Sequence, residues 1–293
     1  MERLTIATVT YNSLEYIKFF LESLRANADV PYHLIIVDNY STDGTAEFLA
    51  SQKDIEVVLN KRNLGFGQGN NQAFIRTKTP YFLGLNSDTV VGPGFLSRIL
   101  KFADEHNEYA EFGVHSNCIG AKNPKTGENI NSEIQSLVEK GQSPFEAVGN
   151  YYSNLGLFME QFAETNPGMV TMEVPPDFIG GWCFLVRTEA VKQAGGLFDR
   201  RFKIGFWEDV DLSWRLALAG HKIGLISEAY LHHFTHVSFR ESKEKLRRSD
   251  KAISRANGLR FAEKWSDQIK QILEDKLASG MILEEIIRRY HVF

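Results

Sequence analysis

The sequence predicts an α/β fold in which a mainly parallel central sheet is flanked by helices. Strand-like and helix-like segments alternate three times before residue 80, and alternation at this spacing is typical of βαβ units. The next segment, Tyr81–Leu85, is apolar on both faces, as expected of a strand that helices cover on both sides. The chain has 293 residues and is 43% hydrophobic, so it can bury the core that such a sheet requires.

The first part of the chain consists of three pairs of a strand and a helix. The predicted strands are rich in β-branched residues, and the predicted helices repeat apolar residues every three to four positions. The predicted elements are, in order, a strand at Leu4–Thr10, a helix carrying Leu14, Ile17, Leu21 and Leu24, a strand at His33–Val37, a helix through Phe48 and Leu49, a strand at Ile55–Leu59, and a helix that ends near Thr77. Tyr81–Leu85 then becomes the fourth strand.

After a helix near Leu96–Ala103 this alternation stops. Residues 116–176 are polar and rich in Asn and Gly, with weak helical periodicity around Phe145–Phe162, and we expect a variable insertion there. The later predicted elements are a strand at Asp177–Val186 that contains a Gly pair, a short helix, an amphipathic helix that opens at Phe206–Leu212 and ends at Gly220, one or two strands within Lys222–His233, charged helices from Glu241 through Lys276, and a last apolar helix around Ile282, Ile286 and Ile287.

The composition excludes several classes of protein. The net charge of -4, from 33 basic and 37 acidic residues, provides no global basic surface for nucleic acid. No apolar run approaches the roughly 20 residues that span a bilayer, and the first residues lack the pattern of a signal peptide, so we expect a cytoplasmic protein. Cys118 and Cys183 are too few for a disulfide framework, and we expect both to be buried thiols.

Polar clusters fall at the ends of several predicted elements, where ligands of open α/β sheets bind. The clusters are Asp38, the loop Gly65–Asn71, the run Asn86-Ser87-Asp88, the pair Glu208-Asp209, and the segment His232–Ser238. Asp88, flanked by Asn86 and Ser87, offers hard oxygen ligands to a divalent cation that phosphate oxygens would share. The alternative is that these three residues only form a turn and cap the helix that follows.

In this order the clusters resemble the motifs of family 2 glycosyltransferases, which use nucleotide sugars and have the GT-A fold. The resemblance extends from Leu4 to about Phe239 and includes bacterial rhamnosyltransferase-like members. Residues 8–12 resemble the family's opening strand, residues 36–44 its nucleotide-binding loop, residues 85–88 a variant of its Asp-x-Asp metal motif, and residues 207–215 the acidic motif that carries the catalytic base.

The resemblance implies an inverting enzyme that transfers a sugar from a UDP- or dTDP-sugar to an acceptor hydroxyl, with Mn²⁺ or Mg²⁺ on the diphosphate. It implies Asp209 as the general base, with Glu208 orienting the loop or holding the acceptor. Asp88 and His233 are the expected metal ligands, and His232 and His236 are alternates for the histidine. Asn86 stands where the commonest motif has Asp, which weakens the expectation of metal dependence.

Donor and acceptor residues follow from the same motifs. The expected donor-binding residues are Thr10, Tyr11, Asn12, Asp38, Asn39, Gly67, Asn70, Asn71, Asn86 and Ser87. Asp38 can accept a hydrogen bond from the imide N–H of uracil or thymine, which cytosine lacks; the alternative is an Asx-turn or helix cap. The glycine loop either lets the backbone approach the nucleotide or only opens a helix. For the acceptor we expect Gly181, Trp182 and Trp207, with core packing as the alternative for both tryptophans.

The expected domain organisation is a GT-A domain over residues 1–239, with residues 116–176 as a variable insertion on the acceptor side, and a helical extension over residues 240–293. The expected acceptor is a saccharide or a lipid-linked saccharide of a cell-surface glycan. The basic C-terminal helices would then contact the inner face of a membrane, pack on the domain, or form a homodimer. Two other functions remain open: a non-catalytic nucleotide-sugar-binding protein, and a sugar nucleotidyltransferase. The latter normally has a basic, Gly-rich loop where this chain has Tyr11-Asn12-Ser13.

Overall fold

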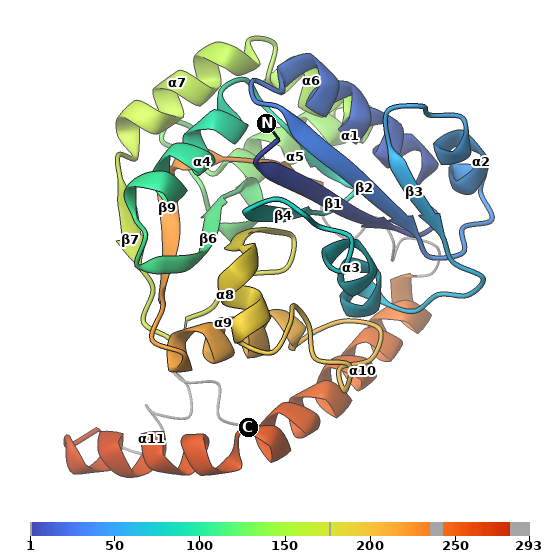
Figure 1. The fold of residues 1–293 in the computed structure, drawn as a ribbon. Coiled ribbons are helices and arrows are strands. Elements are labelled where there is room, and N and C mark those ends of the chain that lie inside the picture. Colours follow the sequence, from blue (N-terminus) through green and yellow to red (C-terminus); the bar gives the residue numbers. More distant parts are fainter. Residues whose placement is uncertain (1, 176, 235–242, 282–293) are drawn as a thin grey trace.

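The computed structural model describes residues 2–175, 177–234 and 243–281, and its centre is an eight-stranded sheet (Figure 1). The strand order is β3-β2-β1-β4-β8-β6-β9-β7. The strands are β1 (Leu4–Thr10), β2 (Tyr32–Asp38), β3 (Glu56–Leu59), β4 (Tyr81–Leu85), β6 (Tyr109–His115), β7 (Met169–Thr171), β8 (Cys183–Arg187) and β9 (Lys222–Tyr230). A separate antiparallel pair joins β5 (Thr89–Val90) to β10 (His232–His233).

Most strands of this sheet run in one direction. Neighbours β3, β2, β1 and β4 are parallel, as are β6 and β9, whereas β8 is antiparallel to β4 and β6, and β7 is antiparallel to β9. The α/β fold with a mainly parallel sheet is therefore confirmed. The first four strands match the predicted segments closely because each combines apolar alternation with polar loops at both ends.

Helices cover both faces of the sheet. They are α1 (Leu14–Asn27), α2 (Thr45–Ala50), α3 (Phe66–Phe74), α4 (Phe95–Glu105), α5 (Ile130–Glu139), α6 (Pro144–Tyr151), α7 (Leu155–Thr165), α8 (Thr188–Gln193), α9 (Glu208–Leu218), α10 (Lys243–Lys264) and α11 (Ser266–Ala278). In β4, Leu83 faces the core formed with α1 and α4 to α7, and the adjacent Phe82 faces the core formed with α3, α8 and α9. This alternation explains why the strand is apolar on both faces.

Three details differ from the expectations. β6 was not expected, although it is buried along nearly its whole length in the middle of the sheet. The strand expected from Asp177 begins only at Cys183, because Gly181 turns its N–H towards Asp209 instead of a neighbouring strand. Cys118 is exposed, since it lies in the 3₁₀ turn Asn117–Ile119 that follows β6, whereas Cys183 is buried in β8 as expected.

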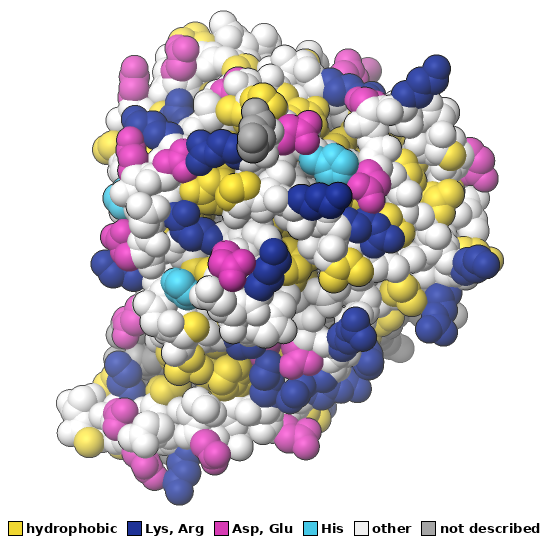
Figure 2. Space-filling view, in the orientation of Figure 1, with side chains coloured by type: hydrophobic (Ala, Val, Ile, Leu, Met, Phe, Trp, Pro, Cys, Tyr) yellow, Lys and Arg dark blue, Asp and Glu magenta, His cyan; other side chains and the backbone are white. Residues whose placement is uncertain are grey.

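The C-terminal helices lie at one side of the domain. α10 runs diagonally below the domain at the lower right, and α11 extends along the bottom left of the view (Figure 1). Phe202, Trp214, Phe261 and Trp265 form a small buried cluster between α10 and the domain. Lys and Arg side chains gather around α10 on the face shown in Figure 2. The expected boundary at residue 239 and the expected helix at residues 282–287 lie outside the described residues. Among the described helices, none is both long and apolar enough to cross a membrane.

Candidate active site at the carboxyl ends of the strands

The candidate site lies where the strand order reverses. The chain adds β2 and β3 on one side of β1 and then places β4 on its other side, so the carboxyl ends of β2, β1 and β4 adjoin. Thr10 at the end of β1 is the direct register partner of Asp38 at the end of β2. The run Asn86-Ser87-Asp88 follows β4 on the other side. Such a reversal opens a crevice beyond the strand ends in open α/β sheets.

The loop after β1 is tied to both neighbouring loops. Asn12 has a left-handed backbone, with φ of 47°. Its Oδ1 accepts a hydrogen bond from Thr42 N at 2.8 Å, and its own N–H donates to Ser41 Oγ at 2.8 Å. Ser13 Oγ lies 3.4 Å from Ser87 Oγ. The expected donor residues of the first, second and fourth loops are therefore brought together, and Tyr11 of the first loop is partly exposed.

Asp38 forms the expected turn and still has a free oxygen. Its Oδ2 accepts hydrogen bonds from Tyr40 N at 3.1 Å and Ser41 N at 3.0 Å, which is the Asx-turn alternative. Its Oδ1 is buried and has no hydrogen-bond partner among the described residues. A buried carboxylate oxygen without a partner is costly, so an oxygen in this position points to a missing donor.

Most polar residues of the third loop have structural partners. Asn71 hydrogen-bonds both the N–H and the carbonyl of Phe198, at 2.9 Å and 2.8 Å. Asn70 Nδ2 donates to the carbonyl of Phe66, and Asn39 Nδ2 donates to the carbonyl of Gly65. These contacts hold α3 and its entry loop against the sheet and against the segment before α9.

The glycines of this loop also have packing reasons. A Cβ on Gly69 would lie 2.7 Å from Val9 Cγ1 in β1, so only glycine lets α3 approach the strand this closely. Gly65 has φ of 86°, and a Cβ there would lie 2.4 Å from Ile204 Cα. A Cβ on Gly67 would meet only ordinary contacts. The close approach of a ligand is therefore not needed to explain Gly65 and Gly69.

Asp88 and His233 meet beyond the carboxyl end of β4 although 145 positions separate them. Asp88 Oδ1 lies 3.1 Å from His233 Nε2, and Asn86 Nδ2 lies 3.3 Å from the same nitrogen. The pairing of β10 with β5 places His233 opposite Thr89, the residue after Asp88. Within the described ranges, no three His, Cys, Asp or Glu side chains group as a metal site, so this pair would need ligands from elsewhere.

The His233 backbone is held by the turn after β6. Its N–H donates to Asn117 Oδ1 at 2.8 Å, and Asn117 Nδ2 returns a bond to its carbonyl at 3.0 Å. The same carbonyl accepts from Cys118 Sγ at 3.2 Å. The ring of Trp182 stacks on the imidazole with centroids 5.4 Å apart. Trp182 thus contacts the expected metal ligand, and its carbonyl also accepts from Asn86 N.

The two described histidines of this segment differ in environment. Burial lowers the pKa of His233, but the hydrogen bonds and charges of Asp88 and Cys118 together outweigh burial and raise that pKa to about 9. Burial and the neighbouring His233 lower the pKa of His232 to about 3. His232 Nδ1 instead lies 3.1 Å from the hydroxyl of Tyr152 at the end of α6. His232 is thus part of the packing of the insertion, and His236 lies outside the described residues.

Glu208 and Asp209 begin α9 and face different surroundings. Glu208 is 3% exposed and packs beside Gly67 and Gly205, and burial, followed by the charge of Asp209, raises its pKa to about 8. Asp209 is only partly buried; its Oδ2 accepts from Gly181 N at 3.0 Å and its Oδ1 from Val210 N at 2.9 Å. Burial raises the pKa of Asp209, against the lowering effect of these N–H groups.

Within residues 207–215, the Asp211–Arg215 pair and the ring of Trp207 have structural roles. Asp211 and Arg215 form the expected ion pair, at 2.8 Å. The ring of Trp207 packs against Phe261, with centroids 5.1 Å apart, and covers Gly258 of α10. The ring of Trp207 therefore packs against α10, as in the core-packing alternative to acceptor binding. The ring of Trp182 instead lies beside His233.

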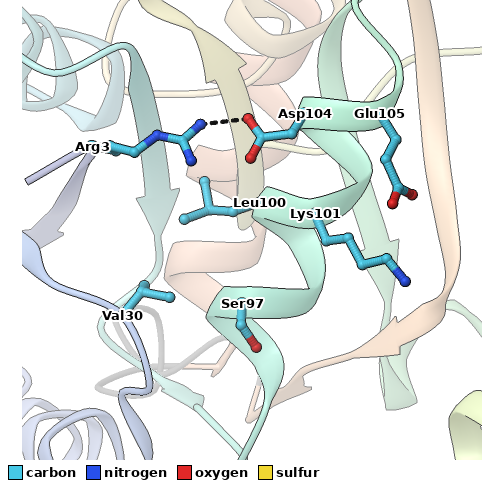
Figure 3. A pocket seen from close by; sticks show the side chains of 7 residues that line it. All are labelled: Arg3, Val30, Ser97, Leu100, Lys101, Asp104 and Glu105. Carbon is cyan, nitrogen blue, oxygen red and sulfur yellow. Dashed lines mark hydrogen bonds and ion pairs between the residues drawn. The ribbon is translucent and has the colours of Figure 1, made fainter.

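A surface hollow lies at the opposite end of the sheet (Figure 3). It has a volume of about 380 Å³ and is lined by Arg3 and Val30, which precede β1 and β2, and by one face of α4. Arg3 pairs with Asp104 across it. It therefore contains none of the residues at the carboxyl ends of the strands.

Three buried polar residues were not expected from the sequence: Asn117, Glu111 in β6, and Asn257 in α10. Glu111 is a single acidic residue within an apolar strand, which is a usable signal once that strand is recognised. Asn257 lies four positions before Phe261 and seven before Lys264, and this spacing marks one face of a helix. Nothing in the sequence around Asn117 distinguishes it from the other polar residues of the insertion.

Comparison with known proteins relates this arrangement to sugar transfer. Residues 5–163 match the model of a family described as glycosyl transferase family 2. The N-acetylglucosaminyl-diphospho-decaprenol L-rhamnosyltransferase of Mycobacterium tuberculosis is 26% identical, over 98% of this chain and 94% of that protein. The rhamnosyltransferase WbbL of Escherichia coli is 23% identical, over 79% of this chain and 83% of that protein.

Solved structures share the fold. The mannosyltransferase PcManGT from Pyrobaculum calidifontis, in complex with GDP-Man and Mn²⁺, has a TM-score of 0.56 at 14% identity, over 88% of this chain and 64% of that one. S. aureus TarS has a TM-score of 0.55 at 21% identity, over 80% of this chain and 36% of that one. GalNAc-T7 with UDP, GalNAc and Mn²⁺ has a TM-score of 0.52 at 12% identity, over 78% of this chain and 43% of that one.

Proposed function

Because this chain belongs to glycosyltransferase family 2, a family of inverting enzymes, we propose that it transfers a sugar from a UDP- or dTDP-sugar to an acceptor hydroxyl. The observation that carries this proposal is the continuity of the site. Asp38 ends β2 and Asp88 follows β4, the strands on either side of β1, and Gly181-Trp182 joins the Asp88–His233 pair to Asp209 through a stacked ring and a hydrogen bond. Nucleobase, diphosphate and acceptor would then lie in this order.

Asp88 and His233 suit a divalent cation chemically. A carboxylate oxygen and an imidazole nitrogen 3.1 Å apart are a donor set that Mn²⁺ and Mg²⁺ accept, with diphosphate oxygens as the natural remaining ligands. Such a cation, when bound, would offset the charge that develops on the departing diphosphate. Asn117 and Trp182 would fix the imidazole in place, and the amide of Asn86 lies close enough to contact it.

Asp209 is the proposed general base. The acceptor hydroxyl is a poor nucleophile until its proton is removed, and Asp209 is the partly exposed carboxylate at the start of α9. The Gly181 and Val210 N–H groups orient it and stabilise its charged form. The buried carboxyl of Glu208, with a pKa of about 8, would mostly hold its own proton at neutral pH and would support the loop instead.

For the acceptor we propose a lipid-linked saccharide of a cell-envelope glycan. The supporting observation is the M. tuberculosis relative, whose name specifies a decaprenol-linked saccharide and which is similar along nearly its whole length. Rhamnose is the sugar named for both relatives, and dTDP-rhamnose is therefore the first donor to test. TarS has been solved with UDP-GlcNAc, which makes UDP-sugars the second set.

Calorimetry with UDP, dTDP and CDP tests the nucleotide. We expect UDP or dTDP to bind roughly 10-fold or more tightly than CDP, because Asp38 Oδ1 would accept from the imide N–H and would lie unpaired against cytosine. In Asp38→Asn, the amide oxygen has to serve the Tyr40 and Ser41 N–H groups, so its NH₂ faces the base and the preference narrows or reverses. Equal affinities in the unmodified protein would contradict this role.

A further inference from the structure

The segment Lys203–Trp207, directly before Glu208, has an unusual backbone. Ile204, Phe206 and Trp207 have φ of 66°, 73° and 76°, in the left-handed region that residues other than glycine rarely adopt. Such conformations are strained in residues other than glycine and persist only where surrounding contacts impose them. Three of them in four positions require an external support.

Asn257 of α10 provides hydrogen bonds to this segment. It is fully buried, its Oδ1 accepts from Lys203 N at 3.2 Å, and its Nδ2 donates to the carbonyls of Lys203, Gly205 and Phe206 at 2.9, 2.7 and 3.3 Å. Arg260 Nη1 donates to the same Oδ1 at 2.6 Å. An amide side chain supplies an acceptor oxygen and two N–H donors from separate atoms, whereas a carboxylate accepts without donating.

Other residues on the same face of α10 hold both ends of the segment. Trp207 covers Gly258, where a Cβ would lie 3.2 Å from the indole, and packs on Phe261. Lys264 Nζ bonds Asp199 before the segment at 2.8 Å and Asp211 after it at 2.5 Å. The C-terminal helix therefore contacts the chain at several points between Asp199 and Asp211.

The segment in turn contacts the loop that opens α3 and leads directly into Asp209 at the start of α9. Ile204 pairs with Gly65, and its carbonyl accepts from Phe66 N at 2.6 Å, in the loop that opens α3. Two residues after Trp207, Asp209 accepts from Gly181 N. The side chains of Ile204 and Phe206 are 44% and 40% exposed. A change in this backbone would therefore shift Asp209 and the neighbouring surface together.

We infer that Asn257 is a positioning residue for sugar transfer: it holds Lys203–Trp207 in its left-handed course and so sets the place of Asp209 beside Gly181. The expected effect on the rate of transfer rests on the proposed function. The support of Lys203–Trp207 by Asn257 rests on the hydrogen bonds alone. The C-terminal helix thereby becomes part of the catalytic unit, although it contributes no group that touches the reacting atoms.

The test compares Asn257→Ala and Asn257→Asp with Leu259→Ala, a control in the same helix whose side chain is 68% exposed. We expect kcat for transfer to fall roughly 10- to 100-fold in both Asn257 variants, as for a displaced catalytic group, with donor affinity within about twofold. Asn257→Asp should be affected at least as strongly as Asn257→Ala, because a carboxylate would face three carbonyls. The control should match the unmodified protein.

Amide hydrogen exchange separates this inference from the proposed function. Exchange in peptides covering residues 199–209 should accelerate in both Asn257 variants, with the strands of the sheet unchanged. Hydrogen exchange can be measured even if the protein turns over no donor. Accelerated exchange without any transfer would contradict only the proposed function. Unchanged exchange, or kcat within twofold of the unmodified protein in Asn257→Asp, would overturn the inference. If Asn257→Ala does not fold, Asn257→Asp decides, because it keeps the shape of the side chain.

Discussion

Glu208 and Asp209 are adjacent acidic residues, and burial raises the pKa of both, but their exposure and hydrogen-bond partners differ. The Glu208 carboxyl is buried between glycine backbones and has a pKa of about 8, whereas Asp209 is partly exposed and accepts two backbone N–H bonds. N–H donors stabilise a charged carboxylate, and burial destabilises it. A base that must accept a proton has to be ionised first, so the geometry favours Asp209 for this task.

Asp209→Asn should lower transfer by roughly 10²- to 10⁴-fold while the protein stays folded and binds the donor, because the amide keeps the size of the side chain and loses its basicity. Glu208→Gln is the matched variant, since Gln resembles the protonated carboxyl that Glu208 already carries near neutral pH. It should stay within a few-fold of normal activity when both variants are assayed for release of nucleoside diphosphate from the donor in the presence of acceptor. Near-normal transfer in Asp209→Asn together with inactive Glu208→Gln would move the base to Glu208.

Glu111 is a buried carboxyl outside the crevice whose titration affects stability. Burial raises its pKa to about 8, against a hydrogen bond from Ser213 Oγ at 2.7 Å. The folded state therefore holds this proton more tightly than the unfolded state does. The resulting stabilisation is present in full below the unfolded pKa, near 4.5, and is lost as pH rises towards 8.

Glu111→Gln should remove this pH dependence. The free energy of unfolding of the variant minus that of the unmodified protein should increase by on the order of 2–4 kcal/mol between pH 5 and pH 8. Urea denaturation of both proteins at the two pH values measures this difference. Glu22→Gln, on the exposed side of α1, is the control and should not change with pH in this way. A constant difference between Glu111→Gln and the unmodified protein across this range would show that Glu111 is ionised in the fold.

At the scale of elements, the contact of α3 with β1 positions the third loop. Gly69 in α3 faces Val9 in β1, and the missing Cβ allows the two backbones to approach. Helix propensity and packing make opposite predictions here. Alanine is favoured over glycine in a helix by about 1 kcal/mol, whereas forcing extra atoms into a packed contact costs about 1–3 kcal/mol.

Gly69→Ala should therefore destabilise the protein by about 1–2 kcal/mol, because its Cβ would lie 2.7 Å from Val9 Cγ1 and cannot be placed without moving the helix. Gly149→Ala in α6 is the matched variant, since a Cβ there meets nothing within 4 Å. It should leave stability unchanged or raise it by up to about 1 kcal/mol. Chemical denaturation measures both, and a stabilised Gly69→Ala variant would show that α3 moves freely on the sheet.

Two short strands, β5 and β10, position the Asp88–His233 pair. β5 and β10 have two residues each, and their pairing brings His233 to Asp88. Segments of this length carry no periodicity that a sequence could reveal. Their geometry comes from the turn Asn117–Ile119 and from the aromatic residues Tyr152 and Trp182, which contact His232 and His233 from two sides.

At the scale of the whole molecule, the fold assembles one site from distant parts of the chain. Strand ends supply Asp38 and Asp88, the segment after β9 supplies His233, and the start of α9 supplies Asp209. A ligand that bridges these groups would bind only the folded chain. Its binding free energy would then add to the stability of the whole domain.

UDP or dTDP together with Mn²⁺ should therefore raise the melting temperature more than nucleotide or metal alone. At 100 times the dissociation constant the stabilisation is about 2.7 kcal/mol, which corresponds to a rise of several degrees. Chelation should remove the metal-dependent part, and Asp88→Ala should abolish it while the domain stays folded. The same rise after chelation would mean that the nucleotide binds without the Asp88–His233 pair.

The sequence by itself determined the α/β class, the first four strands and the positions of Asp38, Asp88 and Asp209 at element ends. Each of these rests on local physics, because apolar alternation sets which face of a strand is buried and polar residues mark where the chain leaves the sheet. The family motifs follow the same local order, and the comparisons confirm the family that they indicate.

Only the tertiary structure decided how these residues are held in place. The family motifs already indicated Asp88 and His233 as ligands of one cation. The contacts that hold His233 beside Asp88, the free oxygen of Asp38, the packing of Trp207 on α10 and the support of Lys203–Trp207 by Asn257 depend on segments far apart in the chain. Such contacts form because burying apolar surface brings the elements together, and buried polar groups must then find partners wherever the packing places them. That requirement acts through space, so no window of the sequence contains it.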